Sequence, residues 1–504
     1  MATTASDTAF FGHPRGLSTA FFTEMWERFS FYGLRAVVLL YMTAAVTEGG
    51  LGWGVAKAGA IYGTYAALVY MLSLPGGWVA DKLIGLRRSV LYGGILIAMG
   101  QLTLAIPVPG LLFLGLGFII LGTGLLKPNV SVIVGELYGK TDQRRDAGFS
   151  IFYMGINLGA TIAPIVVGGL AQAPSFRAML TGWGLDPLNA WHWGFGFGAL
   201  GMAFGVIQFR LGWKYLGDIG TKPSVPKESP EGAAARKTAW MGALGTVAIL
   251  AAVGALVSSG MWSVEGVAGA FKYVFAAVVV GFFIGLFTMG QWTADERKRL
   301  IVVLVLFISA AIFWAAFEQA PSTLNIFARD NTRTTIFGWA YPSSWMQSIN
   351  SFFIIVMAPV FAWVWLKLGS RDPSSPTKFG IGLTFAGLGF LVMVFAAQAS
   401  AGGVLVSPLW LVLTYFLHTI GELCLSPVGL SSMTKLAPDR VKGMIMGVWF
   451  LAASMGNLIA GNVTKLYESF TVPQLFGAVA VFCLVPAVIM FLLVKPIAKM
   501  MAQK

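Results

Sequence analysis

Long apolar segments separated by short polar connections recur from one end of the chain to the other. Runs such as LLFLGLGFIILGTGLL and VVLVLFISAAIFWAAF are apolar throughout and lack the period-two alternation of a membrane β-strand. Segments of roughly 20 apolar residues are long enough to cross the hydrocarbon core of a bilayer as helices. The pattern therefore predicts an all-α polytopic membrane protein.

The apolar segments predict 14 transmembrane helices in a six, two, six arrangement. Their approximate ranges are 17–46, 57–80, 88–107, 111–135, 147–172 and 188–213; then 237–260 and 266–292; then 297–322, 342–368, 377–400, 406–430, 439–467 and 472–495. Two six-helix bundles are typical of secondary transporters, whose substrate site lies near the midplane between the halves. We expect an N-terminal bundle over 1–215, a cytoplasmic linker with two inserted, peripheral helices over 216–296, and a C-terminal bundle over 297–504.

Composition and charge support a membrane protein and argue against a nucleic-acid partner. The 504 residues are 57% hydrophobic and 11% charged, with a mean hydropathy of +0.76, whereas about a quarter of a soluble domain is charged. The net charge of +13 comes from cations that gather in alternate connections, which is the positive-inside pattern and places both termini in the cytoplasm. These cations are Lys82, Arg87 and Arg88; Lys140, Arg144 and Arg145; Arg297, Lys298 and Arg299; Lys367, Arg371 and Lys378; Lys435, Arg440 and Lys442.

Two further features carry little chemistry. Cys424 and Cys483 both lie inside apolar segments, so we expect buried thiols and neither a disulfide nor a metal site. The polar start MATTASDTAFFGHPRG has no cleavage-type signal, and we expect the first helix to act as an uncleaved anchor.

Ionisable side chains inside the predicted helices are the strongest indication of function. Such a group at the bilayer centre costs roughly 2.5 to 3.5 kcal/mol, so it marks a functional site by default. Positions 24, 27, 28 and 35 share one helical face, and Glu24 can pair with Arg28 across one turn. A purely structural network is one interpretation; the other is a functional site in which Lys127 partners the remaining charges. The full set is Glu24, Glu27, Arg28, Arg35, Lys127, Glu318, His418 and Glu422.

The two halves differ in the sign of these charges. The first half contributes the cations Arg35 and Lys127, and the second half contributes the carboxylates Glu318 and Glu422. The natural ligand of such a dipolar cavity is a zwitterion, and a dipeptide or tripeptide spans more of it than a free amino acid because each extended residue adds about 3.3 to 3.6 Å. Aromatic and amide side chains accompany the charges and can line the pocket, although each could equally serve packing: Tyr32, Tyr70, Asn157, Trp314, Asn350 and Trp449.

His418 precedes Glu422 by one helical turn. A histidine titrates near neutral pH, which would suit a proton relay. We favour the other interpretation, a packed or hydrogen-bonded histidine.

Several motifs resemble known transporter signatures. The stretch GGWVADKLIGLRR, residues 76–88, is similar to the loop between helices 2 and 3 of the major facilitator superfamily. The segment Glu24-Met-Trp-Glu27-Arg28-Phe29-Ser30-Phe31-Tyr32 resembles the ExxERFxYY signature of the proton-dependent oligopeptide transporter family, with Phe31 at the first tyrosine position. Further similar stretches follow in order along nearly the whole chain: LLKPNVS, FSIFYMGINLGATIAP, FWAAFEQ and GELCLSPVGLS.

The resemblance implies a bacterial di- and tripeptide symporter in the inner membrane, with protons as the coupling ion and no cofactor. It implies that Glu24, Glu27 and Arg28 couple protons together with Lys127, and that Arg35 pairs with Glu318 as an extracellular gate. Lys127 and Arg35 would lie near the peptide carboxylate and Glu422 near its amino terminus. The pocket would be lined by Tyr32, Tyr70, Asn157, Trp314, Asn350 and Trp449. We expect a functional monomer in the lipid bilayer.

Two alternatives stay open at this point. One is a carrier of the same superfamily for another small anion or zwitterion, such as nitrate or a peptidomimetic drug. The other is a membrane-embedded enzyme or receptor, but the sequence contains no HExxH, GxSxG or Walker-type motif and no soluble signalling domain. The glycine-rich GLGFIILGTG lies inside a predicted helix and indicates close helix packing. We therefore expect a transporter and not an enzyme.

Overall fold

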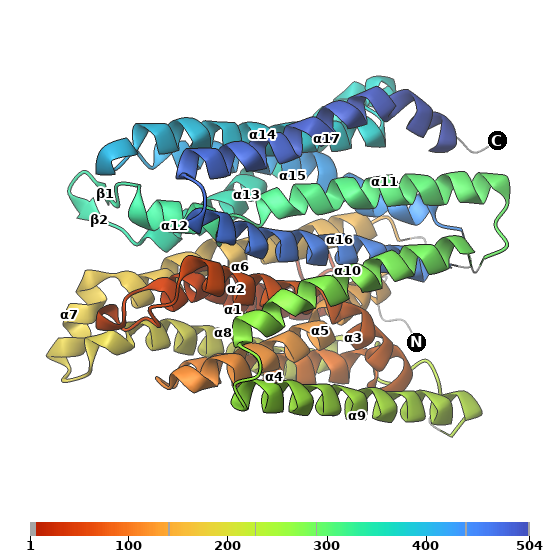
Figure 1. Cartoon of the computed structure of the whole chain (residues 1–504). Helices are drawn as coiled ribbons and strands as arrows, with labels where there is room; N and C mark the ends of the chain where they lie inside the picture. The colour runs from red at the N-terminus through yellow and green to blue at the C-terminus, as the bar shows by residue number, and fades with distance from the viewer. Residues whose placement is uncertain (1–6, 140–141, 227, 289, 439–440, 502–504) are drawn as a thin grey trace. The chain divides into compact units, whose positions relative to one another are not determined.

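The computed structural model describes residues 7–139, 142–226, 228–288, 290–438 and 441–501. Its elements are helices and one two-stranded hairpin (Figure 1). Each of the 14 predicted segments coincides with a helix or, for 57–80, with two successive helices. Within the described ranges, 11 helices are long and apolar enough to cross a membrane. Of the basic residues used for the orientation, Lys140 and Arg440 lie outside the described residues.

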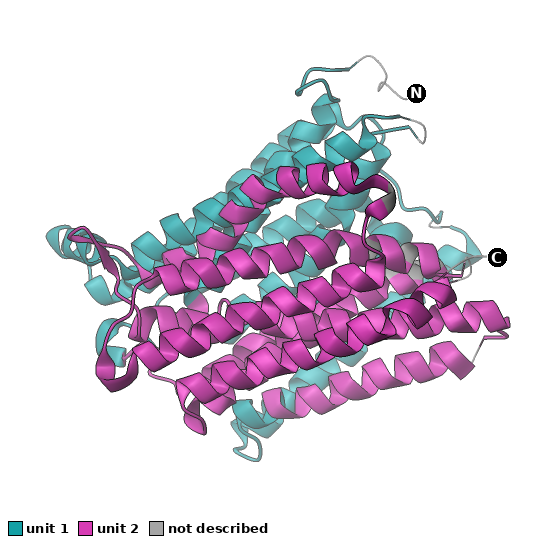
Figure 2. Ribbon diagram, turned by 90° about the horizontal axis from the view of Figure 1, so that it is seen from above, with its two compact units in different colours: residues 1–37, 46–51, 68–267 teal, residues 38–45, 52–67, 268–504 magenta. Residues whose placement is uncertain are grey.

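The helices divide into two compact units, which are coloured separately in Figure 2. Unit 1 comprises residues 1–37, 46–51 and 68–267, and unit 2 comprises 38–45, 52–67 and 268–504. This division differs from the three predicted parts, whose boundaries stay a prediction. The helices up to α10 are α1 (Arg15–Thr43), α2 (Val55–Met71), α3 (Ser73–Val79), α4 (Leu86–Leu104), α5 (Leu112–Glu136), α6 (Arg145–Gln172), α7 (Pro174–Gly182), α8 (Ala190–Gly212), α9 (Pro230–Ser258) and α10 (Val264–Thr288).

Glycines let α4 and α5 pack backbone to backbone in unit 1. A Cβ built on Gly93 would lie 2.6 Å from the Gly122 carbonyl oxygen, and one built on Gly100 would lie 2.6 Å from that of Gly115. Larger side chains would therefore separate the two helices, which is the usual role of small residues in membrane helix packing. The glycine-rich run of α5 serves helix packing, as predicted.

The linker after α8 is fastened to the first turn of α4 and to the short helical turn before it. We call residues 217–224 the linker strap. The Arg87 guanidinium donates to the main-chain oxygens of Ile219, at 2.5 Å, and Gly217. The Ser224 amide and hydroxyl both donate to the Asp81 main-chain oxygen, at 2.7 and 2.8 Å. The motif GGWVADKLIGLRR thus anchors the linker to unit 1.

The second half continues with α11 (Ala294–Phe317), α12 (Thr323–Asp330), β1 (Thr335–Ile336), β2 (Trp339–Ala340), α13 (Ser348–Leu368), α14 (Ser375–Ala399), α15 (Leu409–Leu436), α16 (Lys442–Val463) and α17 (Val472–Met501). The strands pair antiparallel, with Ile336 opposite Trp339. Phe337 and Gly338 form the turn with φ of 50° and 79°, as a two-residue hairpin requires.

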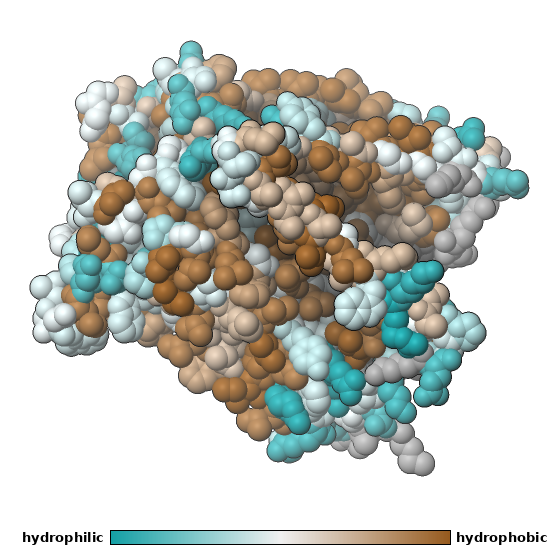
Figure 3. All heavy atoms as spheres, turned by 60° about the horizontal axis from the view of Figure 1, so that its bottom comes forward, coloured by the Kyte–Doolittle hydropathy of each residue, from teal (hydrophilic) through white to brown (hydrophobic). Residues whose placement is uncertain are grey.

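The inserted pair is largely exposed. In the most apolar 18-residue window of each helix, 0% of the α9 residues and 22% of the α10 residues are buried. Their exposed side chains are largely apolar, among them Leu244, Val247 and Leu250 of α9. Such a surface suits contact with lipid, and the space-filling view in Figure 3 shows apolar residues over much of the face toward the viewer. The peripheral position expected for the pair stays a prediction.

Candidate functional site

Three of the five charged side chains of α1 form a buried cluster within unit 1. The Arg28 Nε lies 3.0 Å from Glu24 Oε1 and 2.5 Å from Glu27 Oε2. The exposed fractions are 3% for Glu24, 1% for Glu27 and 4% for Arg28. The Glu24–Arg28 pair is found as predicted, and Glu27 shares the same guanidinium.

Close neighbours on α6 and α8 bury this cluster. A Cβ on Gly159 of α6 would lie 2.2 Å from the Met25 main-chain oxygen and 3.1 Å from Arg28 Cβ. A Cβ on Gly201 of α8 would lie 2.6 Å from the Phe29 ring. Because both helices present glycine at these contacts, α1 fits between them with its charges removed from solvent.

Lys127 of α5 adds a second cation near the cluster. Its Nζ lies 3.7 Å from the centre of the Tyr70 ring, a cation–π geometry. Lys127 also interacts electrostatically with Glu24. Pro128 follows inside the helix and has no amide hydrogen to donate to the carbonyl of Gly124 one turn earlier. The predicted association of Lys127 with the α1 charges is therefore present in unit 1.

The remaining predicted residues of unit 1 extend this polar region. Arg35 lies over the Tyr32 ring, 5.3 Å from its centre. Phe31, which replaces a tyrosine of the resembled signature, is buried and lies 5.3 Å below the Arg28 guanidinium. Asn157 of α6 is 4% exposed and donates to the Tyr153 main-chain oxygen at 3.0 Å.

Unit 2 brings Glu422 and Asn350 together. The Asn350 side-chain amide donates to Glu422 Oε2 at 3.2 Å and to the Thr419 hydroxyl at 2.9 Å. Glu422 is 9% exposed. An oriented amide and a nearly buried carboxylate together offer an acceptor that suits a cationic ligand group.

Two predicted tryptophans meet in the same unit. The rings of Trp314 and Trp449 lie 6.5 Å apart at 76°, and Trp314 also makes an edge contact with Phe317 at 5.4 Å. A Cβ on Gly456 of α16 would lie 2.4 Å from Trp314 Cβ. The glycine therefore allows α16 to approach α11 at the indole.

The sequence-based range for the helix around Glu318 was wrong at its end. The predicted helix extends to residue 322, whereas α11 ends at Phe317 and Glu318 is its C-cap. The chain then turns through Gln319 and Ser322, with the Gln319 side chain accepting from the Thr323 hydroxyl at 2.9 Å. Pro321 follows in this turn, and a helix seldom continues into a proline. Glu318 is 3% exposed and lies at a helix end.

His418 occupies a tight packing position in α15. It is 1% exposed, Nε2 lies 3.2 Å from the Ala386 main-chain oxygen, and its ring lies 5.1 Å from Phe390. A Cβ on Gly389 would lie 2.5 Å from this imidazole. The structure thus places His418 as a packed, hydrogen-bonded residue, the interpretation favoured from the sequence.

Sequence reasoning missed one buried amide next to α1. Gln101 of α4 is 1% exposed and donates to both the main-chain and hydroxyl oxygens of Ser30, at 2.9 and 3.0 Å. The signal was a glutamine within an otherwise apolar segment. Gln101 fixes the rotation of α1 two residues beyond Arg28 of the charged cluster.

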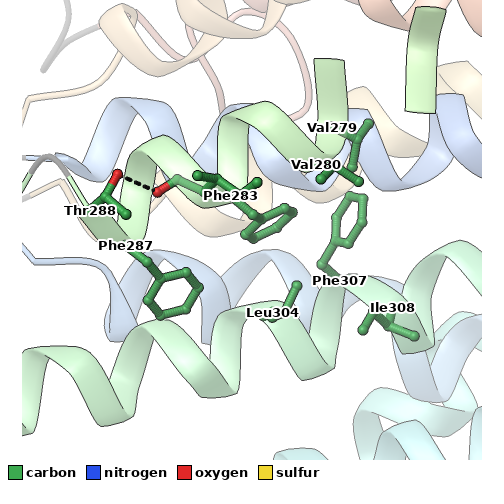
Figure 4. A pocket seen from close by; sticks show the side chains of 9 residues that line it. Val279, Val280, Phe283, Phe287, Thr288, Leu304, Phe307 and Ile308 are labelled. Carbon is green, nitrogen blue, oxygen red and sulfur yellow. Dashed lines mark hydrogen bonds between the residues drawn. The ribbon is translucent and has the colours of Figure 1, made fainter. Parts of the chain in front are cut away.

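An apolar cavity of about 510 Å³ lies elsewhere, between α10 and α11 (Figure 4). Phe283 and Phe287 point toward Phe307 and Leu304, and the one hydroxyl, of Thr288, is bonded to the Ile284 carbonyl at 2.8 Å. This lining offers no group for a polar ligand. Across the described ranges, no cluster of three His, Cys, Asp or Glu side chains could hold a metal ion.

These observations define a class of protein before any comparison. A chain with numerous apolar helices that buries charged groups of both signs has the construction of a secondary carrier. A profile of the POT family matches residues 87–482, and the chain belongs to this family.

Relatives and solved structures agree over the whole length. The chain is 44% identical to "Peptide transporter YePEPT" of Yersinia enterocolitica subsp. palearctica, over 99% of this chain and 97% of the relative. It is 38% identical to a "Di-/tripeptide transporter" of Lactococcus lactis subsp. cremoris, over 98% of each chain. A crystal structure of a peptide transporter POT in complex with sulfate matches with a TM-score of 0.89 at 43% identity, over 98% of this chain and 97% of that one. The predicted major facilitator fold is confirmed.

Proposed function

We propose that this chain is a proton-coupled symporter that imports di- and tripeptides across the inner membrane by alternating access. One observation carries the proposal: a chain similar over its whole length to proteins named as peptide transporters buries an arginine between two glutamates on α1, with a lysine nearby. Burial of a charged cluster repays little in stability, so a role in coupling explains why it is present.

The geometry of α1 supports the proposed proton step. Glu27 Oε2 lies 2.5 Å from Arg28 Nε and is almost fully buried. A carboxylate held by a cation stays ionised, whereas one that loses its cation in a low-dielectric site takes up a proton. Protonation of Glu24 or Glu27 frees Arg28 and Lys127 from part of their charge pairing. Lys127 then serves the peptide carboxylate.

The second step of the proposal is a gate formed by Arg35 and Glu318. Both side chains are nearly buried, at 6% and 3% exposure. Their opening and closing accompanies rocking of the two six-helix halves about the substrate.

Peptide recognition is divided between opposite charges. Arg35 and Lys127 lie near the peptide carboxylate, and Glu422, oriented by Asn350, accepts the terminal ammonium. The side-chain pocket is formed by Tyr32, Tyr70, Asn157, Trp314 and Trp449. The protein works as a monomer with both termini in the cytoplasm, it catalyses no chemical reaction, and it needs no cofactor.

Uptake of labelled dialanine into liposomes tests the proposal. An inward proton gradient is expected to drive accumulation, and a protonophore is expected to abolish it. Glu24→Gln and Glu27→Gln are each expected to lose gradient-driven uptake while peptide exchange without a gradient persists. Lys127→Gln is expected to lose gradient-driven uptake and to weaken exchange as well, because Lys127 also serves the peptide carboxylate. Glu228→Gln removes an exposed carboxylate of the linker and is expected to behave as wild type. Uptake indifferent to the gradient would contradict symport.

The alternative, a carrier of nitrate or another small anion, makes a different prediction at Glu422. An inorganic anion has no ammonium for this carboxylate, so Glu422→Gln would leave its transport unchanged. We expect Glu422→Gln to weaken dialanine binding by roughly tenfold to a hundredfold, as loss of a hydrogen bond to a charged group does. N-acetyl-dialanine lacks the ammonium and is expected to bind both proteins equally weakly.

A further inference from the structure

A second, polar cavity lies wholly within unit 2, at the helix ends where basic residues gather. Its volume is about 650 Å³. Four elements contribute to it: the first turns of α11, the start of α14 with the residues before it, the last turns of α15, and the end of α17. The lining includes Arg299, Asp372, Ser375, Lys378, Ser432 and Lys435.

The charges of this cavity do not balance. Lys378 already has partners, because its Nζ lies 2.7 Å from Asp372 Oδ2 and 4.2 Å from the centre of the Trp365 ring. Arg299 and Lys435 remain, and neither makes a salt bridge with a residue in the described ranges. One carboxylate among three cations leaves an excess of two positive charges.

Hydroxyl groups complete the lining. Ser432 donates to Ser375 at 2.8 Å, so the two hydroxyls connect α15 to the start of α14. The Ser375 hydroxyl is a further donor on this wall. Cations together with hydroxyl donors favour an oxyanion with several acceptor oxygens, such as a phosphate.

We propose that this cavity binds the phosphate of an anionic phospholipid. Basic pockets between membrane helices at the cytoplasmic surface hold lipid head groups of this kind. The cavity lies at one end of each of four helices, α11, α14, α15 and α17. A head group bound to Arg299 and Lys435 therefore leaves its acyl chains beside the apolar helix surfaces. The lipid ties the ends of four helices of unit 2 together, a role separate from peptide transport.

The test is lipid retention by the purified full-length protein, measured by native mass spectrometry. Palmitoyl-oleoyl phosphatidylglycerol is titrated in detergent, with phosphatidylcholine of the same chains and inorganic phosphate as parallel arms. Wild type is expected to retain one phosphatidylglycerol in preference to phosphatidylcholine. The double variant Arg299→Gln/Lys435→Gln is expected to bind it roughly tenfold or more weakly.

A matched control removes two charges from the same helix end without touching the cavity. Arg297→Gln/Lys298→Gln lies beside Arg299 in sequence but outside the lining, and it is expected to retain the lipid as wild type does. Arg299→Lys/Lys435→Arg keeps both charges and is expected to retain it too, which guards against misfolding of the glutamine variant.

Three results would overturn the proposal. The first is equal loss of phosphatidylglycerol in the cavity variant and the control, since binding would then follow overall surface charge. The second is equal retention of phosphatidylcholine and phosphatidylglycerol by wild type. The third is saturation by inorganic phosphate at the same concentration as the lipid, which would make the cavity a site for the free ion.

Discussion

Arg28→Gln isolates the energetic role of the buried cluster on α1. The guanidinium lies 3.0 Å from Glu24 and 2.5 Å from Glu27, and all three residues are at most 4% exposed. Glutamine fills similar space and keeps hydrogen-bonding capacity, but it leaves two carboxylates without their central cation.

The cost can be estimated from these contacts. Removing one partner of a buried pair typically costs about 3–5 kcal/mol, because the remaining charge is uncompensated. Lys127 still interacts with Glu24, so we expect the lower end, about 3 kcal/mol. Replacing Glu27 as well, in Glu27→Gln/Arg28→Gln, leaves Glu24 and Lys127 with balanced charges, and this double variant is expected to recover most of this loss. A destabilisation of this size lowers the unfolding midpoint by roughly 6–12 °C at about 2–4 °C per kcal/mol.

Thermal unfolding in detergent, followed by size-exclusion chromatography, measures the effect without depending on transport. Arg88→Gln removes an exposed arginine and is expected to stay within about 0.5 kcal/mol of wild type. The reasoning is refuted if Arg28→Gln melts as wild type does, or if Glu27→Gln/Arg28→Gln is no more stable than Arg28→Gln.

Two further predictions concern the packing of α6 against α1 and the buried tyrosine Tyr138. Gly159→Ala would place a methyl group 2.2 Å from the Met25 main-chain oxygen, so the melting temperature is expected to fall by an amount equivalent to about 1–3 kcal/mol. The control is Gly117→Ala, whose added methyl group would have no atom within 4 Å. Equal melting of both variants would contradict the packing argument. Burial raises the pKa of Tyr138, which lies outside the membrane helices, to about 12, while an unfolded tyrosine titrates near 10. The contribution of Tyr138 to stability is therefore complete below pH 10 and is lost as the pH rises toward 12. Wild type is expected to be more stable than Tyr138→Phe by about 1 kcal/mol, from the 2.9 Å hydrogen bond with His13, and this advantage should disappear between pH 10 and 12. An advantage that stays constant from pH 8 to 12 would contradict the prediction.

The sequence predicted best what depends on helical periodicity and on the cost of burying charge. The 3.6-residue repeat places Glu24, Glu27 and Arg28 on one side of a helix, and apolar neighbours on all sides require that side to be covered. Length and hydropathy likewise located the membrane helices. Both inferences use forces that act along one element.

Features that depend on contacts between distant segments could not be obtained in this way. The amide of Gln101 is unremarkable until α4 is placed against Ser30 of α1, and the partners of Arg87 lie more than a hundred residues later in the chain. The end of α11 at Phe317 depends on the turn that follows, where side-chain and main-chain hydrogen bonds compete with the helix. The polar cavity of unit 2 arises from four separate helix ends, and no local pattern specifies it.

The linker strap has a consequence for the order in which the chain is built. A polypeptide leaves the ribosome from its N-terminus, and early parts can fold before later ones exist. The partners of Arg87 and Asp81 in the strap are Gly217, Ile219 and Ser224. All three lie between α8 and α9. The strap can therefore fasten once the first six membrane helices have been made, while the rest of the protein is still unsynthesised. Its attachment would mark the completion of the first bundle during biogenesis.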